Sequence, residues 1–454
     1  MKWKMIVAGL CLLVVSMAVA CGTDDAGGGA VAPEVGNVAV DAGEDDAPIT
    51  ITFWTHANPA FIEAARLFAD RYSSASPNVT VVHESFPDMW TQVYSAMAAG
   101  TGGDVIEFHG STMRFAQGGL VTSVPESVMS IAEIESTFYA GALVNRYFNG
   151  RYYGLPAELN IESPGLFVNT ALLQSHGFEV PQSWMDNDGP ASWSEVMELA
   201  RELTEWSGGT MMRSGLGIVG AEEISMLLSL IWQLGGDYLD PDNMRVNFNT
   251  PEGIRAAEFI MDLITGPDAV HSSIFSPRRD GFLEGTIAMT ISAPWFSAVI
   301  RQDMPGLEFE YFNLPPFIEG SNPYFIAQGG WGYFVPTTTI HQEESWQFIR
   351  YMLTDENQLE WAIITGNLPS NMRVAEDEFF TTGEGRDVIG RAMQIAHYGR
   401  DPGAWTIDPS QLVWDIGRRT LEMITTGQIS IEDGMALMDA DANEMIQRLI
   451  AEGE

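Results

Sequence analysis

Basic residues are scarce in this sequence of 454 residues, which has 22 lysines and arginines against 61 acidic residues and a formal net charge of −39. Binding to nucleic-acid phosphates needs clustered lysine and arginine, so the composition excludes a nucleic-acid partner. The only lysines are Lys2 and Lys4. A lysine that forms a Schiff base or acts as a base is therefore excluded from the rest of the chain. We interpret the acidity as a general property of the surface.

Cysteine is almost absent, since Cys11 and Cys21 are the only two. Beyond them the sequence excludes disulfides, thiolate metal sites and cysteine nucleophiles. The apolar run Met5–Ala20 follows two lysines and is short for a membrane-spanning helix, so it predicts a signal peptide. The small residues before Cys21 resemble a bacterial lipoprotein processing site. We expect residues 1–21 to be a lipoprotein signal peptide with Cys21 as the lipidated residue, although an ordinary signal peptide cut nearby is the alternative.

Sequence motifs of common enzymes are also missing. There is no Gly-x-Ser-x-Gly elbow, no phosphate-binding loop and no dinucleotide fingerprint after the first predicted strand. None of the seven histidines pairs with another at a metal-ligand spacing. The turn at Asp240 has Arg245 and Pro251 where a calcium loop needs glycine and glutamate. We expect no cofactor, no metal and no enzymatic activity, but the many carboxylates leave a glycoside hydrolase open as an alternative.

Residues 22–48 are small and acidic with no aromatic side chain, which predicts a disordered tether. The residues after it alternate between β-branched or aromatic runs and runs with helical spacing. Such alternation predicts βαβ units around a parallel sheet. The expected strands are Ile49–Trp54, Val79–Glu84 and Asp104–Phe108, and the expected helices are Phe61–Tyr72 and Met89–Ala99.

Later in the chain, capping residues mark the starts of further helices. Ser192 predicts a helix over Glu195–Trp206, and Thr250 and Ser430 each precede an amphipathic stretch. The apolar run Ile287–Ile291 predicts a buried strand with Trp295 just beyond its carboxyl end.

Aromatic and amide-bearing residues gather at the predicted ends of strands. Aromatic rings can stack on the apolar faces of sugars while a few polar groups bind the hydroxyls, so the set predicts a site for a neutral, hydroxyl-rich ligand. Packing inside the protein is the alternative for each of them. The set consists of Trp54, His56, Asn58, Phe108, His109, Tyr153, Asn160, Trp295 and Trp331.

Several short motifs follow one another in a recognisable order: ITFWTH, GGDVIEF, YGLP with LFVNTALL, GGDYLDPDNMRVNFNTPEGIRAAEFI, FLEGTIAMTISAPWF, and GGWGYFVP with ESWQFIRYMLT. Together with Cys21, these motifs resemble the extracellular solute-binding proteins of ABC importers, in their carbohydrate-binding, maltose-binding-protein-like branch. The resemblance covers nearly all of the chain from Ile49 onward.

The resemblance implies an α/β fold, the two-lobed periplasmic binding protein type II fold with three interdomain crossings. One lobe would comprise residues 49–155 plus 287–332, and the other residues 156–286 plus 333–454. Ligand-binding positions carried over from the family are His56, Asn58, Phe108, His109, Ser111, Glu158, Asn160, Glu162, Trp295 and Trp331.

The implied function is capture of a mono- or oligosaccharide between two closing lobes and its presentation to the permease of an ABC transporter. We expect a monomer on the outer side of the cytoplasmic membrane, or in the periplasm, held to the membrane only by its N-terminal lipid. His56–Asn58 and Ser111 replace charged sugar contacts of the maltose binder, so maltose itself is not implied. A binder of a polyamine or a metal ion stays open, because Tyr152 and Tyr153 are similar to tyrosine-based iron sites.

Overall fold

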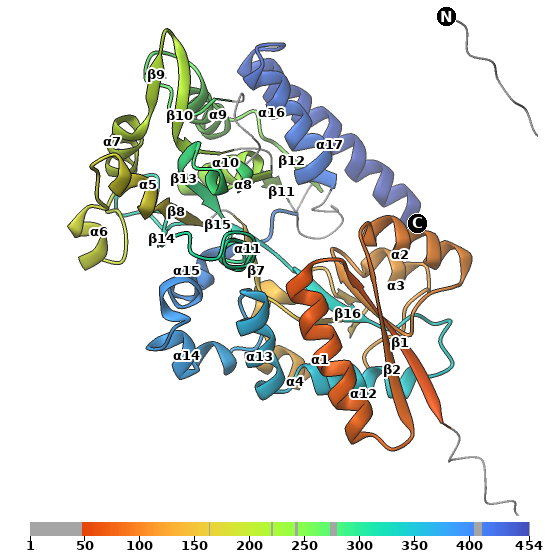
Figure 1. Cartoon of the computed structure of the whole chain (residues 1–454). Coiled ribbons are helices and arrows are strands. Elements are labelled where there is room, and N and C mark those ends of the chain that lie inside the picture. The colour runs from red at the N-terminus through yellow and green to blue at the C-terminus, as the bar shows by residue number, and fades with distance from the viewer. Residues whose placement is uncertain are drawn as a thin grey trace, which may run out of the picture. The chain divides into compact units, whose positions relative to one another are not determined.

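The computed structural model describes residues 48–453, except for residue 163 and the ranges 219–220, 241–243, 273–278 and 404–410 (Figure 1). The expected signal peptide with Cys21, and the tether up to residue 47, lie outside the described residues. Within the described ranges, no helix combines the length and apolar character needed to cross a bilayer.

The first sheet confirms the predicted alternation of strands and helices. Its strand order is β2-β1-β3-β16-β6, and β1 pairs in parallel with both β2 and β3. Helices α1 (Pro59–Ala75) and α2 (Met89–Ala99) make the connections. Asn58 caps α1, since its Oδ1 accepts the N–H of Ala60 at 3.0 Å. The strands are β1 (Ile49–His56), β2 (Val79–Phe86), β3 (Val105–His109), β6 (Leu155–Pro156) and β16 (Trp331–Phe334).

The second sheet has the order β14-β8-β13-β10-β9, and its central strand β13 is buried along its whole length. Helices α7 (Trp193–Leu203), α8 (Ala221–Gln233) and α9 (Pro251–Ile264) supply the apolar side chains of its core. The capping residues predicted from sequence are confirmed, as Thr250 Oγ1 accepts the N–H of Gly253 at 3.1 Å. The strands are β8 (Gly165–Asn169), β9 (Glu205–Ser207), β10 (Thr210–Gly217), β13 (Ile287–Ser292) and β14 (Phe309–Asn313).

Two expectations about the chain's course are wrong. The expected division placed residues 287–332 with the first sheet, but β13 pairs with β8 and β10 of the second. Only from Trp331 does the chain rejoin the first sheet, and β16 runs on past Gly332 to Phe334. A buried apolar run shows that a strand is central but not which sheet it joins. The helix expected over Glu195–Trp206 ends at Leu203, because residues 205–207 pair with β10 instead.

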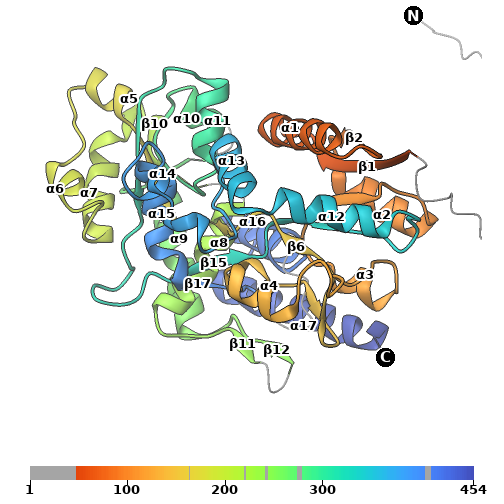
Figure 2. The ribbon, with the colours of Figure 1, turned by 90° about the horizontal axis from the view of Figure 1, so that it is seen from below.

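Segments that join the two sheets pair with each other. In chain order, β7 (Asn160–Glu162) connects β6 of the first sheet to β8 of the second, and β15 (Phe325–Gln328) connects β14 of the second sheet to β16 of the first. They form a three-stranded sheet with β17 (Gly399–Arg400) in the order β17-β15-β7. Beyond β16, helices α12 (Gln342–Met352) and α13 (Asp355–Thr365) pack against α1 (Figure 2), whereas α17 (Ile431–Gly453) packs against α9.

We expect Gly215→Ala to lower the free energy of unfolding by about 1 to 3 kcal/mol, the usual cost of overpacking. A Cβ at this position in β10 would overlap the backbone carbonyl of Ala200 in α7. At Gly102 the nearest atoms to a Cβ lie 3.6 and 3.8 Å away, so Gly102→Ala is the matched control and should be close to neutral. Equal denaturant midpoints for the two variants would contradict this close helix–sheet packing.

Candidate functional site

A cavity of about 900 Å³ opens at the carboxyl ends of β1 and β3. Its volume falls within the range of about 300 to 1,000 Å³ typical of ligand pockets. The expected site residues His56, Asn58, Phe108, His109, Ser111, Glu158, Asn160, Trp295 and Trp331 all line it. The backbone of Glu162 pairs with Ile326 in the small sheet, but its side chain lies outside the described part of the structure.

Two of the residues that line the cavity, His56 and Trp331, form a stacked pair. Their ring centroids are 3.8 Å apart and their planes are nearly parallel, at 8°. The Nδ1 of His56 lies 2.7 Å from Oε2 of the buried Glu107, and the backbone N–H of His56 donates to the same oxygen at 3.2 Å. Phe61 meets the imidazole edge-on at 4.3 Å. These contacts fix the imidazole, so Trp331 has a rigid surface behind it.

The backbone that carries Trp331 is held by two buried charged side chains. Glu158 Oε1 accepts the N–H of Trp331 at 2.9 Å, and Arg146 Nη2 donates to the carbonyl of Gly330 at 2.7 Å. Gly330 has a φ of +65°, and a Cβ there would lie 2.7 Å from the side chains of Glu158 and Asn160. Only glycine combines a favourable positive φ with the absence of a Cβ that would clash here. Burial lowers the pKa of Arg146 to about 10, so it stays charged at neutral pH.

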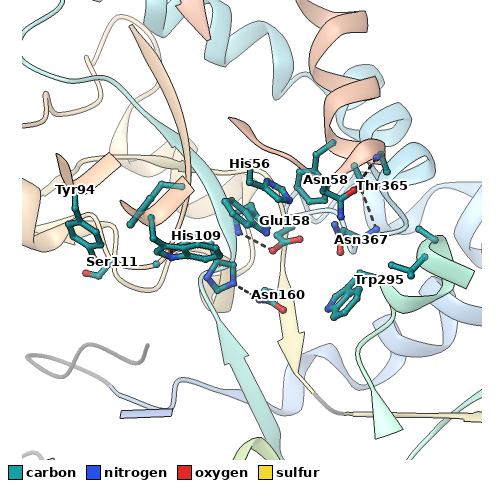
Figure 3. A pocket seen from close by; sticks show the side chains of 18 of the residues that line it. His56, Asn58, Tyr94, His109, Ser111, Glu158, Asn160, Trp295, Thr365 and Asn367 are labelled. Atoms are coloured by element: carbon teal, nitrogen blue, oxygen red, sulfur yellow. Dashed lines mark hydrogen bonds between the residues drawn. The ribbon is translucent and has the colours of Figure 1, made fainter. Parts of the chain in front are cut away.

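His109 and Asn160 form a second polar pair in the cavity (Figure 3). Asn160 Nδ2 lies 2.8 Å from His109 Nε2. Burial lowers the pKa of His109 to about 4, and the nearby Arg146 adds to the effect. The imidazole is therefore neutral at neutral pH, and an unprotonated Nε2 accepts the amide hydrogen. The amide Oδ1 of Asn160 then remains available as an acceptor.

Trp295 reaches the cavity from the second sheet. It follows β13 and precedes helix α11 (Phe296–Asp303), which also contributes Ala298, Val299 and Gln302 to the lining. The expected division places Trp295 on the first lobe, but the pairing of β13 with β8 and β10 puts it on the second. Rings of the first sheet and of the second thus border the same cavity.

Sequence reasoning missed several lining residues. Trp90 and Tyr94 stand four residues apart on α2, away from the buried side chains of Met89, Val93 and Met97, and are 41% and 44% exposed. Such exposed aromatics on one face of an amphipathic helix were a usable signal. The cavity is also lined by Thr365, Asn367 and Asp415. The sequence around these three residues has no comparable pattern that would have predicted their place in the site.

Two residues of the predicted aromatic set lie elsewhere. Trp54 donates from Nε1 to Glu84 at 2.8 Å, and Tyr153 packs beside Phe148. Tyr152 belongs to another cavity, where its hydroxyl donates to Glu135 at 3.3 Å. Within the described ranges, no group of three or more His, Cys, Asp or Glu side chains could hold a metal ion.

The chain belongs to the family described as bacterial extracellular solute-binding protein, whose sequence profile matches residues 68–386. A maltotriose-binding protein of Pyrococcus abyssi is 21% identical over 352 residues, covering 76% of this chain and 72% of the relative. A multiple sugar-binding protein of Streptococcus mutans is 21% identical over 350 residues, covering 73% and 77%. Both relatives are named as binding proteins.

Solved structures of similar fold include an ABC transporter solute-binding protein of Thermotoga lettingae bound to α-D-tagatose. It aligns with a TM-score of 0.69 at 19% identity and covers 88% of this chain and 100% of its own. The maltose/maltodextrin-binding domain from Bdellovibrio bacteriovorus bound to maltotriose gives the same four values. These likenesses confirm the two-lobed α/β fold.

Titration of His109 should make the folded protein less stable as the pH falls. Its pKa is about 4 when folded, against an ordinary value of 6.5, so the unfolded chain takes up the proton first. The free energy of unfolding that comes from keeping His109 neutral is fully present above about pH 6.5 and is lost progressively as the pH falls toward about 4.

His109→Gln keeps a hydrogen-bonding side chain but does not titrate. Its thermal midpoint should therefore fall less than that of the wild type between about pH 7 and about pH 5. Parallel curves for the two proteins would show that His109 is not neutral in the folded state.

Proposed function

We propose that this protein is the extracytoplasmic sugar-binding component of an ABC importer. The observation that carries the proposal is a cavity bordered by tryptophans from both sheets, by side-chain amides and by the neutral imidazole of His109. Indole rings match the apolar faces of pyranoses, and neutral amides match their hydroxyls. The relatives named for maltotriose and for multiple sugars support the same ligand class.

Binding would favour a closed arrangement of the two lobes. A ligand shifts a conformational equilibrium only by its differential affinity for the two states, so it must contact both sides. The stacked pair of His56 and Trp331 belongs to the first sheet, whereas Trp295 belongs to the second. A sugar that touches both would hold the lobes together. The segments that contain β7 and β15 would act as hinges, and three crossings remain our prediction.

The partners follow from this role. We propose that the closed form is recognised by the membrane permease, and that the ligand is released unaltered. A lipid on Cys21 would hold the monomer at the outer side of the cytoplasmic membrane, with residues 22–48 as the tether. Cys21 and residues 22–47 lie outside the described residues, so the proposal rests on the sequence pattern there.

A secreted hydrolase is less well supported. Of the carboxylates that line the cavity, Glu158 is buried and accepts the N–H of Trp331, and Asp415 is exposed. A thermal-shift screen of the mature protein against a carbohydrate panel, followed by calorimetry, tests binding. Incubation of any hit with the protein tests turnover. Stabilisation without product supports a binder, and product formation would overturn the proposal.

Trp295→Ala should weaken binding of the sugar found in this screen by about tenfold or more, which is about 1.4 kcal/mol. The reason is the loss of a large aromatic surface at the side of the cavity that belongs to the second sheet. Trp206→Ala removes an exposed tryptophan of β9 that does not line the cavity and serves as the control. Calorimetry measures both affinities, and unchanged binding by Trp295→Ala would remove this residue from the site.

A further inference from the structure

Asn367 is a buried polar residue whose side-chain amide has no hydrogen-bond partner among the described residues. It is only 5% exposed, yet it lines the large cavity. Its neighbour Thr365 and the tryptophan Trp295 line the same cavity, and Figure 3 shows these residues toward one end, with Tyr94 and Ser111 toward the other. A polar side chain with so little exposure usually has a hydrogen-bond partner in the protein, so an amide that instead faces a cavity is a candidate contact for a ligand.

The backbone around Asn367 is fixed on both sides. Its N–H donates to Thr365 Oγ1 at 3.3 Å, and that hydroxyl donates to the carbonyl of Trp361 at 2.8 Å. The next residue, Leu368, accepts the N–H of Leu159 at 3.0 Å. The side chain is therefore presented to the cavity by a braced turn.

This turn also lies against the second lobe. Gly366, with a φ of +71°, ends α13, and a Cβ there would lie 2.7 Å from the Cβ of Ala298 on α11. Ala298 lines the cavity one turn after Trp295. A ligand that reaches Asn367 is thus at the junction of α13 and α11.

We propose that Asn367 is a ligand-binding residue that hydrogen-bonds two adjacent hydroxyl groups of a sugar ring. The inference rests on the proposed function and adds to it a specificity-determining contact. A carboxamide presents one acceptor and two donor hydrogens side by side, which is the pattern that a pair of neighbouring hydroxyls can satisfy. A ring lacking one of these hydroxyls would leave the amide partly unpaired, so the site selects against it.

Asn367→Leu separates this role from a structural one. The leucine has nearly the same volume and removes an unpaired amide, so the thermal midpoint of the ligand-free variant should equal or exceed that of the wild type. Its affinity for the sugar found in the screen should fall at least roughly tenfold in calorimetry. Opposite effects on stability and on binding are not expected of a residue that only supports the fold.

Asn357→Leu is the matched control, in the first turn of helix α13, which precedes Asn367. Asn357 is also buried, but its Nδ2 donates to the carbonyl of Tyr351 at 2.7 Å. Its replacement should lower the thermal midpoint and leave the affinity of the folded protein unchanged. If Asn367→Leu behaves in the same way, the inference is overturned.

Deoxy analogues of the sugar test the hydroxyl contact directly. The wild type should bind at least one monodeoxy analogue roughly tenfold more weakly than the parent sugar. The Asn367→Leu variant should bind that analogue and the parent sugar with equal affinity. Wild-type affinity in Asn367→Leu, or the same discrimination in both proteins, would overturn the inference alone. If the wild type binds no carbohydrate, the proposed function fails and the inference fails with it.

Discussion

The buried guanidinium of Arg146 is the contact on which the centre of the structure depends. It donates to the carbonyl oxygens of Ala142, Val144 and Gly330 and so joins the loop before β4 (Tyr147–Phe148) to the strand that carries Trp331. A buried charge is tolerated only when hydrogen bonds replace its water, and these carbonyls together with nearby Glu158 provide that compensation. The close approach explains the glycines on either side of Trp331, because a side chain there would enter the space of Arg146 or of Glu158.

With β16 held in this way, the remaining features of the cavity follow from strand order. Trp331 lies opposite His109 in the pairing of β16 with β3, which brings the indole to the carboxyl end of the parallel strands. In open α/β sheets this edge is where ligands bind. The second sheet contributes through β13, whose end leads directly into Trp295 and α11. Two sheets with separate strand orders can therefore share one cavity, since Trp331 is the first residue of β16 and Trp295 lies just beyond the end of β13.

Much of the first sheet could be predicted from the sequence, because local signals act there. Helix α2 has the expected bounds, with Asp88 capping its start and Gly100 in the left-handed conformation at its end. The sheet to which β13 belongs could not be predicted, since the sequence of a strand that is buried along its whole length does not show which strands it pairs with. The expected site residues followed from positions at strand ends and from the family resemblance. Asn367 had no such signal, because its burial and its unpaired amide arise only when α13 meets α11 and the segment around Leu159.

The cavity has few charged side chains although the whole sequence has a net charge of −39. Among the residues that line the cavity, only Arg114, Glu158 and Asp415 carry permanent charges, and Glu158 is engaged with the backbone of Trp331. The negative electrostatic field of the whole protein repels an anionic solute as it approaches and has no such effect on a neutral solute. Two neighbours of the same fold are described with different sugars, tagatose and maltotriose, so the fold alone does not select the ligand. Selection must then come from side chains at the cavity surface, and under the proposed function a surface made mainly of rings and amides would discriminate by the arrangement of hydroxyl groups rather than by charge.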